Sequence, residues 1–200
     1  MDTTQARRII ESIARSVIAH ADELTQLDQA IGDGDHGVNM KRGFEAVLAD
    51  LDSLAAGDVG ALLNGVGRTL VMKVGGASGP LYGTLFMQLG KTWPPDLTAG
   101  SLHATCQAAI DAVAARGKSR RGQKTLLDVL VPVCDELGAG AGRAALRAFS
   151  AASAQATVPM EATRGRASFL KERSIGHLDP GARSAQLMIE AVCDSLESAG

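Results

Sequence analysis

Aromatic residues are scarce in this sequence: they make up 3% of its 200 residues, with one tryptophan and one tyrosine. Basic residues are not in excess either, because the formal net charge is −2. Proteins that bind nucleic acid use a basic surface, and single-strand binders add aromatic rings that stack on bases. The composition therefore argues against nucleic acid as a partner.

Cysteine and long hydrophobic runs are also scarce. The three cysteines, Cys106, Cys134 and Cys193, form no CxxC pair and lie within helical patterns, as buried thiols of a reducing compartment do. No apolar run reaches about 18 residues, the length of a membrane span, and the N-terminus has no signal segment. We therefore expect a cytoplasmic protein with no membrane partner.

The alternation of β-branched and polar residues that marks a sheet is missing as well. Apolar residues instead recur at helical spacing in eight segments, which predicts an all-α fold. The first predicted helix runs from about Thr4 to Thr25, and the others are centred on residues 40–54, 59–74, 81–89, 98–113, 126–133, 145–156 and 187–196. With 46% hydrophobic residues and no long linker, residues 1–200 are expected to form a single domain.

Polar, glycine-containing stretches separate some of these predicted helices. The most unusual are residues 27–40, 75–80, 116–122 and 165–181. Such stretches would gather at one end of a bundle or barrel of antiparallel helices, since each helix junction there contributes a loop. A functional site at that end is the expectation.

The first stretch carries three carboxylates, Asp28, Asp33 and Asp35. Asp33-Gly34-Asp35 alone is typical of a solvated turn, but Asp28 at the end of the preceding helix lets three acidic groups converge. A calcium loop counted from Asp33 fails, because Gly37 and Phe44 occupy its fifth and twelfth positions. Oxygen ligands without a nearby cysteine favour Mg²⁺ over Zn²⁺.

Two neighbouring features suggest an anion site. His36 is interpreted as a hydrogen-bond donor to phosphate rather than as a ligand of Mg²⁺, with a purely structural role as the alternative. Ser78 and successive backbone amides follow Gly75-Gly76 and open into a helix N-terminus, which attracts anionic oxygens. The alternative there is an ordinary turn of small residues between two helices.

Four motifs together resemble the nucleotide-binding L subunit of bacterial dihydroxyacetone kinase. They are IGDGDHGVNM at 31–40, GGASGPLYGTLF at 75–86, RGKSRRGQKTLLDVL at 116–130 and GRASFLKERSIGHLDPGA at 165–182. The resemblance covers most of the chain in the family's order and spacing. It implies a closed barrel of eight antiparallel helices, with ADP or ATP and two Mg²⁺ ions held at one end.

The resemblance also implies roles for individual residues. Asp28, Asp33 and Asp35 would be the metal ligands through which catalysis proceeds. The nucleotide would be bound by His36, Gly37, Val38, Asn39, Ala77, Ser78, Gly117, Leu126, Arg166, Asp179, Pro180 and Gly181. From composition alone Arg166 would be interpreted as a surface residue.

The implied function is that of a phosphotransferase that passes a phosphoryl group to dihydroxyacetone held on a separate K subunit. Its ADP would be rephosphorylated by a phosphoprotein of the phosphoenolpyruvate-dependent phosphotransferase system, with direct use of ATP as the alternative donor. Erythrulose or another short ketose is an alternative substrate, and a non-catalytic nucleotide sensor is an alternative of another class. A homodimer is left open.

Two residues depart from the family pattern. Gln123 replaces the usual aspartate of a Gly-Asp-Lys-Thr run, and Lys171 replaces a glycine before Glu-Arg-Ser. Together with Arg120 and Arg121 they make the expected mouth of the site more basic. We expect these departures to affect how tightly the nucleotide is held and which partner is bound, but not the metal site.

Overall fold

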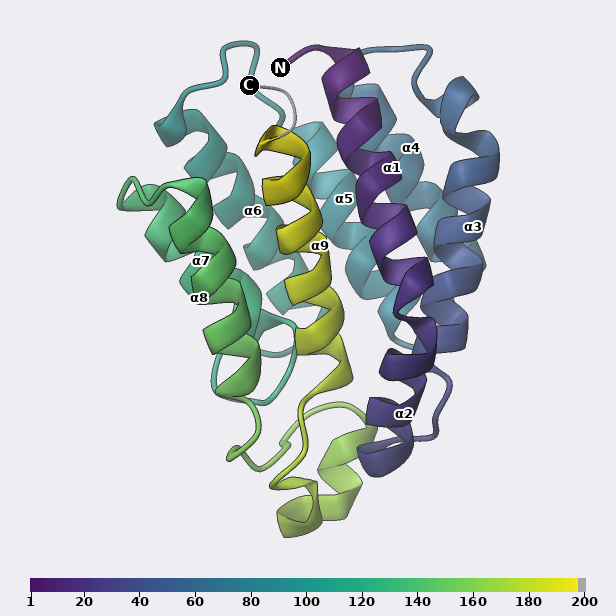
Figure 1. Ribbon diagram of the computed structural model, residues 1–200, viewed down its shortest axis with the longest axis vertical. Helices are drawn as coiled ribbons and strands as arrows, with labels where there is room; N and C mark the ends of the chain where they lie inside the picture. The colour runs from purple at the N-terminus through teal and green to yellow at the C-terminus, as the bar shows by residue number, and fades with distance from the viewer. Residues whose placement is uncertain (198–200) are drawn as a thin grey trace.

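The computed structural model describes residues 1–197, and this range contains helices and loops but no β-strand (Figure 1). An all-α fold, as the apolar periodicity predicted, is therefore confirmed. The described helices are α1 (Thr3–Ala19), α2 (Ala21–Ile31), α3 (His36–Leu54), α4 (Val59–Lys73), α5 (Ser78–Lys91), α6 (Ala99–Gly117), α7 (Leu127–Gly138), α8 (Arg143–Gln155), the 3₁₀ helix η1 (Arg166–Ser174) and α9 (Pro180–Glu197).

The long helices lie side by side, with the N-terminus and the last turn of α9 at one end and with α2 and η1 at the other (Figure 1). From α3 to α9, each α-helix contacts the next one in the chain, and α1 contacts both α3 and α9. Several helix junctions therefore lie at the same end as α2 and η1. No helix of the described chain is both long enough and apolar enough to cross a bilayer.

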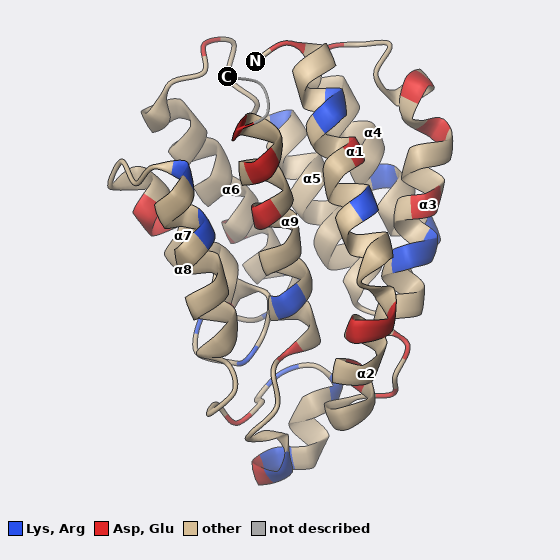
Figure 2. Ribbon diagram, in the orientation of Figure 1, with Lys and Arg blue, Asp and Glu red and all other residues tan. Residues whose placement is uncertain are grey.

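One apolar cluster fills the space between these helices. Phe44, Leu62, Leu70 and Leu127 are fully buried in it. Charged residues are spread along the helices and the loops (Figure 2). Burying side chains of this size contributes roughly 1.5–3 kcal/mol each before the entropy cost of ordering them. The cluster therefore provides a rigid frame for the polar loops.

The predicted first helix, Thr4 to Thr25, is wrong in one respect, because the structure has two helices there. The break falls at His20, whose backbone leaves the helical region (φ −101°, ψ 14°). The ring Nδ1 of His20 donates to Ser16 O at 2.7 Å, which satisfies a carbonyl at the end of α1. Asp22 and Glu23 then occupy the first turn of α2, where negative charge favours a new helix start.

The prediction of eight helices is likewise revised, since the described chain has nine α-helices and one 3₁₀ helix. The additional 3₁₀ helix, η1, lies inside the polar stretch 165–181. It is interrupted at Lys171, which has φ 51° and ψ −128°. Only glycine adopts this backbone region without strain.

Lys171→Gly is accordingly expected to stabilise the protein. Relief of the strained backbone should outweigh the entropy cost of a glycine and raise the free energy of unfolding by about 1 kcal/mol. Urea denaturation followed by circular dichroism measures the change. Lys171→Ala is the matched control, because it removes the charge but keeps the strained Cβ. An equal gain in both variants would mean that the charge, not the backbone, is responsible.

Candidate metal and anion site

The acidic loop between α2 and α3 folds around the carboxylate of Asp28. Asp28 Oδ2 accepts hydrogen bonds from Asp35 N at 2.8 Å and from His36 N at 3.1 Å. Gly34 turns the chain with φ 76°, a value that a residue with a side chain rarely adopts. Asp28 is buried, whereas Asp33 and Asp35 are exposed. The loop therefore has one inner carboxylate and two outer ones.

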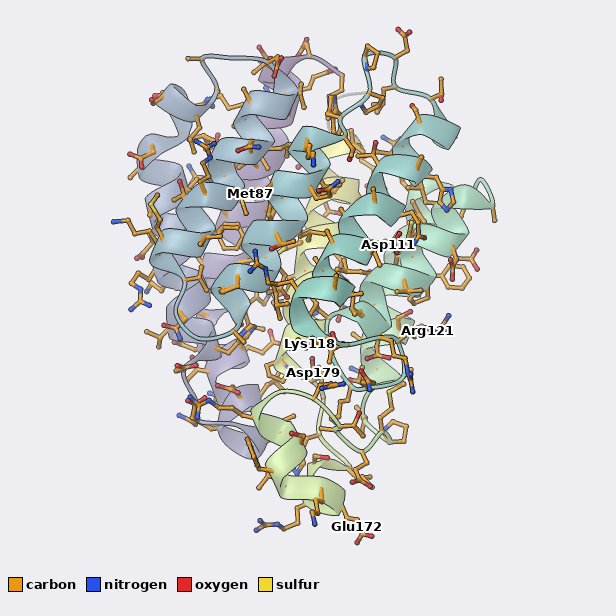
Figure 3. All side chains as sticks on the ribbon, turned by 180° about the vertical axis from the view of Figure 1, so that it is seen from behind. Met87, Asp111, Lys118, Arg121, Glu172 and Asp179 are labelled. Atoms are coloured by element: carbon orange, nitrogen blue, oxygen red, sulfur yellow. The ribbon has the colours of Figure 1, made fainter. Side chains whose placement is uncertain are left out.

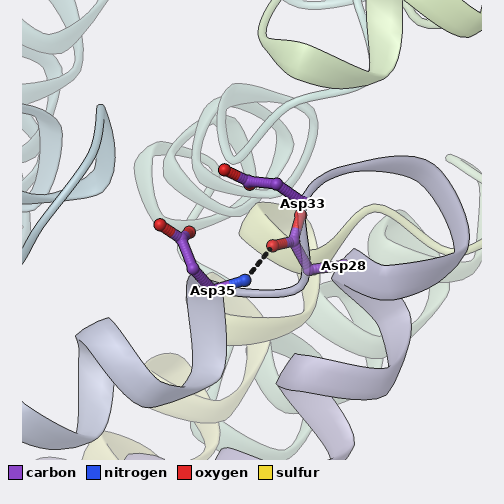
Figure 4. Close-up of side chains that lie close together, drawn as sticks. All are labelled: Asp28, Asp33 and Asp35. Atoms are coloured by element: carbon purple, nitrogen blue, oxygen red, sulfur yellow. Dashed lines mark hydrogen bonds between the residues drawn. The ribbon is translucent and has the colours of Figure 1, made fainter.

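These three carboxylates converge on one point (Figure 4). One oxygen from each lies within 4.8 Å of the others. Opposite oxygens around a bound Mg²⁺ lie about 4 Å apart, so a small adjustment brings this set to one ion. Three negative charges at this spacing repel each other, and a divalent cation with oxygen ligands removes that repulsion. The donor set fits Mg²⁺ and offers no thiolate for Zn²⁺.

The N-terminus of α3 begins directly beside the carboxylates. Asp28 accepts from the amide of His36, so Gly37 and Val38 supply the remaining N–H groups of the first turn. A methyl group at Gly37 would collide with Ala21 O on α2. Gly37 is therefore required for α2 and α3 to approach each other at the site.

Asn39, one turn into α3, is held by the end of α4. Arg42 donates from Nη2 to Asn39 Oδ1 at 2.7 Å and from Nε to Lys73 O at 2.7 Å. A Cβ at Gly75 would lie 2.7 Å from Asn39 Oδ1, so the chain passes here only because this residue is glycine. The Gly75-Gly76 turn is thereby fixed against α3.

His36 joins three helices through two serine hydroxyls. Its Nδ1 lies 3.0 Å from Ser78 Oγ on α5, and its Nε2 lies 3.0 Å from Ser184 Oγ on α9. Tyr82 OH lies 2.6 Å from Ser184 Oγ and also donates to Gly181 O at 2.9 Å. Burial lowers the pKa of His36, which favours a neutral ring with one donor and one acceptor nitrogen. A hydrogen bond from the ring to phosphate would require one serine contact to break.

The N-terminus of α9 forms the opposite wall of the site, with Asp179 at its start. Asp179 Oδ2 accepts from Ala182 N at 2.7 Å, and Asp179 N donates to Thr157 Oγ1 at 3.1 Å. Seen from behind, Asp179 lies above η1, whose Glu172 marks the tip of the molecule (Figure 3). Burial raises the pKa of Asp179 to about 7.

The raised pKa of Asp179 predicts a pH dependence of stability. An aspartate in an unfolded chain has a pKa near 3.9, so between about pH 4 and 7 the folded state holds a proton that the unfolded state releases. This contribution is fully present below pH 4 and is lost as the pH rises towards 7. The wild type should therefore lose about 2–3 kcal/mol relative to Asp179→Asn between pH 5 and 8. Urea denaturation of both proteins tests this, and a constant difference across the range contradicts it.

The helix η1 lines the site through Arg166 and Ala167. Arg166 Nε lies 2.9 Å from Asp33 Oδ2, and 69% of the arginine side chain is exposed, so the pair itself stabilises the fold little. A cavity of about 340 Å³ lies between η1, the acidic loop and the starts of α5 and α9. Of the residues predicted for the site, those lining the cavity are Asp28, Asp33, Asp35, His36, Ala77, Ser78, Leu126, Arg166, Asp179, Pro180 and Gly181.

The remaining predicted residues lie outside the cavity lining. Gly37, Val38 and Asn39 continue α3 away from it, and Gly117 ends α6 behind the cavity-lining Leu81. A larger open hollow of about 920 Å³ lies at the other end of the molecule. Its carboxylates, Asp2 and Asp58, already cap α1 and α4, so it gathers no comparable set of ligands.

Three residues of the site were missed by sequence reasoning: Tyr82, Ser184 and Lys124. Tyr82 and Ser184 each lie one helical turn beyond a predicted residue, Ser78 and Pro180, and that spacing was the available signal. Lys124 lies within the family motif at 116–130, but nothing local indicated its burial, because its contacts come from segments more than thirty residues away.

Comparisons with known proteins give the family of the chain. The family model described as the DAK2 domain matches residues 30–194. The ADP-binding subunit DhaL of the phosphoenolpyruvate-dependent dihydroxyacetone kinase of Escherichia coli K12 is 44% identical over 177 residues, which cover 84% of each chain. The ADP-binding subunit DhaL of dihydroxyacetone kinase 1 of Listeria innocua is 40% identical over 197 residues, which cover 96% of each chain.

A solved structure shares the fold. The dihydroxyacetone kinase of C. freundii in complex with AMP-PNP and Mg²⁺ superposes with a TM-score of 0.76 at 21% identity, covering 95% of this chain and 33% of that one. The identity of 44% with a relative of similar length, together with the DAK2 match, confirms the resemblance seen in the four motifs. This chain therefore belongs to the DAK2-domain family and, within it, to the L subunits of dihydroxyacetone kinase.

Proposed function

We propose that this chain is the Mg²⁺-dependent phosphoryl-transfer subunit of a dihydroxyacetone kinase. It binds ADP or ATP and passes a phosphoryl group to dihydroxyacetone held on a separate K subunit. The observation that carries this proposal is the convergence of Asp28, Asp33 and Asp35 beside the first turn of α3. The names of the DhaL relatives, ADP-binding subunits of dihydroxyacetone kinases, support it.

In this proposal Asp28, Asp33 and Asp35 hold two Mg²⁺ ions. When bound, the ions supply Lewis-acid stabilisation of the charge on the phosphoryl oxygens. Asp28 has a second task, because its carboxylate also accepts from two loop amides. Asp33 and Asp35, which are exposed, contribute charge and ligand oxygens without supporting the core.

The nucleotide is bound by the other residues that the family resemblance implies. Ser78 offers a hydroxyl at the start of α5, and the first-turn amides of α3 favour anionic oxygens. His36 orients the Ser78 hydroxyl through their 3.0 Å contact, so its role is positional. Arg166 presents a fork of donors that matches phosphate oxygens. The complete proposed set, in which His36 acts through Ser78, is His36, Gly37, Val38, Asn39, Ala77, Ser78, Gly117, Leu126, Arg166, Asp179, Pro180 and Gly181.

The proposal extends to the architecture. Helices α1 and α3–α9 form a closed barrel of eight antiparallel helices in one domain, residues 1–200, with the nucleotide at one end. Contacts that lead from α1 through α3 to α9 and back to α1 support this closure. Helix α2 then follows α1 outside the barrel and places Asp28 at the site.

The phosphoryl donor we favour is a phosphoprotein of the phosphoenolpyruvate-dependent phosphotransferase system, which rephosphorylates bound ADP. Both DhaL relatives are named as subunits of phosphoenolpyruvate-dependent kinases. Exchangeable ATP is the alternative donor, and a short ketose such as erythrulose is the alternative substrate.

The free thiols Cys106, Cys134 and Cys193 support a cytoplasmic location. A homodimer is compatible with the proposal.

Reconstitution tests this function. The purified chain is mixed with a dihydroxyacetone-binding K subunit and Mg²⁺, and dihydroxyacetone phosphate is measured with either the phosphoprotein or ATP as donor. We expect turnover with the phosphoprotein at less than one equivalent of added ADP, and mass spectrometry should find ADP that co-purifies. Binding of ADP without turnover by K subunits from several sources would favour a regulatory sensor and overturn the kinase proposal.

A further inference from the structure

Lys124 is a buried lysine whose ammonium contacts only backbone carbonyls. Its side chain is among the largest fully buried ones, and the residue is 1% exposed. Its Nζ donates to Thr157 O at 2.8 Å, to Met160 O at 3.1 Å and to His177 O at 2.6 Å. Three close acceptors match the three hydrogens of an ammonium group. Within residues 1–197 no ion pair joins it to a carboxylate.

These acceptors lie at the two ends of one loop. We name residues 158–177, which include η1, the η1 loop. Thr157 and Met160 lie where the loop begins, and His177 lies where it ends. Gly176 N also donates to Val158 O at 2.8 Å, which closes the base of the loop. The Lys124 ammonium is therefore a cross-link between the two ends of the segment that carries Arg166.

Lys124 is connected to two further walls of the cavity. Thr157, which accepts from the ammonium through its carbonyl, also accepts from Asp179 N through its hydroxyl at 3.1 Å. The backbone of Lys124 has φ 61°, and the following residues, Thr125 and Leu126, line the cavity. This left-handed conformation is strained for a lysine, so the surrounding contacts must hold the residue in it.

Burying an ammonium among neutral carbonyls is costly compared with leaving it in water. Burial lowers the pKa of Lys124, and the Asp179 carboxylate opposes that change. A methionine or leucine would fill the same space without this cost, but it could not join the two ends of a polar loop. The Lys124 ammonium thus supplies hydrogen bonds to both ends of the loop, which an apolar side chain cannot do.

We propose that Lys124 is a positioning residue for nucleotide retention, fixing both ends of the η1 loop so that Arg166 and Asp179 stay at the cavity. The effect on retention rests on the proposed function of the cavity. The cross-link itself does not, and it can be measured without any ligand.

Limited trypsin digestion measures the cross-link directly. The η1 loop presents four exposed cleavage sites, at Arg164, Arg166, Lys171 and Arg173. In Lys124→Met under native conditions we expect cleavage at these sites to be at least tenfold faster than in the wild type. Cleavage at Arg8, an exposed site on α1, should not change.

The control is Leu62→Ala, a cavity-creating change at a fully buried position of α4, near the opposite end of the molecule. It lowers Tm without touching the loop, so it shows what general destabilisation alone does to cleavage. Lys124→Arg, which keeps a cationic donor, should restore part of the protection. This series stays informative even if Lys124→Met does not fold, because Lys124→Arg and Lys124→Gln are compared with the same control.

Calorimetry with ADP and Mg²⁺ adds the functional readout. Lys124→Met and Lys124→Gln should bind ADP at least tenfold more weakly than the wild type, and Lys124→Arg should lose less affinity. Leu62→Ala should bind within twofold of the wild type. The proposal is overturned if loop cleavage and ADP affinity in the Lys124 variants follow Tm in the same way as in Leu62→Ala. If the wild type binds no ADP, the proposed function is overturned. Faster loop cleavage in the Lys124 variants would still support the cross-link in that case.

Discussion

Asp35→Ala is expected to lower the rate of phosphoryl transfer by about a thousandfold or more while leaving the fold intact. Loss of one ligand carboxylate weakens metal binding, and the charge stabilisation supplied by the metal is worth several kcal/mol, about tenfold in rate for each 1.4 kcal/mol. Asp35 is exposed and its side chain caps no helix, so its removal costs little stability. The reconstituted kinase assay measures the loss.

Two further variants separate the metal role from a structural one. Asp28→Ala removes an acceptor of two loop amides as well as a ligand, so it should lose activity and also lower Tm. Asp50→Ala removes an exposed carboxylate from the far half of α3 and should change neither.

Chelation provides an independent measurement. Removing Mg²⁺ with EDTA should lower the Tm of the wild type, since bound metal stabilises the folded state by mass action. The same treatment should shift the Tm of Asp35→Ala much less. An equal shift in both proteins would mean that these aspartates are not the ligands.

Local sequence signals predicted the features of the fold and of the site that depend on near neighbours. The helix predicted over residues 98–113 is α6, and Thr98 caps its start, with its hydroxyl accepting from Ser101 N at 3.1 Å. The helix predicted over residues 59–74 begins at Val59, and the predicted glycine turn before Ser78 also leads into a helix start. Composition, periodicity and turn residues act over a few positions, so they are visible in the sequence.

Contacts between distant segments could not be predicted in the same way. The cross-link by Lys124 joins it to residues 157, 160 and 177, and His36 reaches Ser184 across 148 positions. A lysine in a polar stretch is interpreted as solvated, because burial and partners are properties of the fold. The break at His20 was missed for a related reason, since the apolar periodicity continues through it.

Arg166→Ala is expected to weaken ADP binding by about 10- to 100-fold. A charge-assisted hydrogen bond to phosphate is worth roughly 1.5–3 kcal/mol, and 1.4 kcal/mol corresponds to a tenfold change in affinity. Arg166→Lys should retain part of the affinity, because a lysine supplies a point charge where arginine supplies a fork of donors. Calorimetry with Mg²⁺ present gives the three dissociation constants.

The matched control is Arg173→Ala, which removes the same charge from an exposed position of the η1 loop outside the cavity lining. The contact between Arg166 Nε and Asp33 Oδ2, at 2.9 Å, adds a second readout. Arg166 competes with a cation for that carboxylate, so Arg166→Ala should bind Mg²⁺ alone as tightly as the wild type or more tightly. Weaker ADP binding with undiminished Mg²⁺ binding therefore assigns Arg166 to the nucleotide. ADP affinities of Arg166→Ala and Arg173→Ala equal to that of the wild type would identify Arg166 as a surface residue.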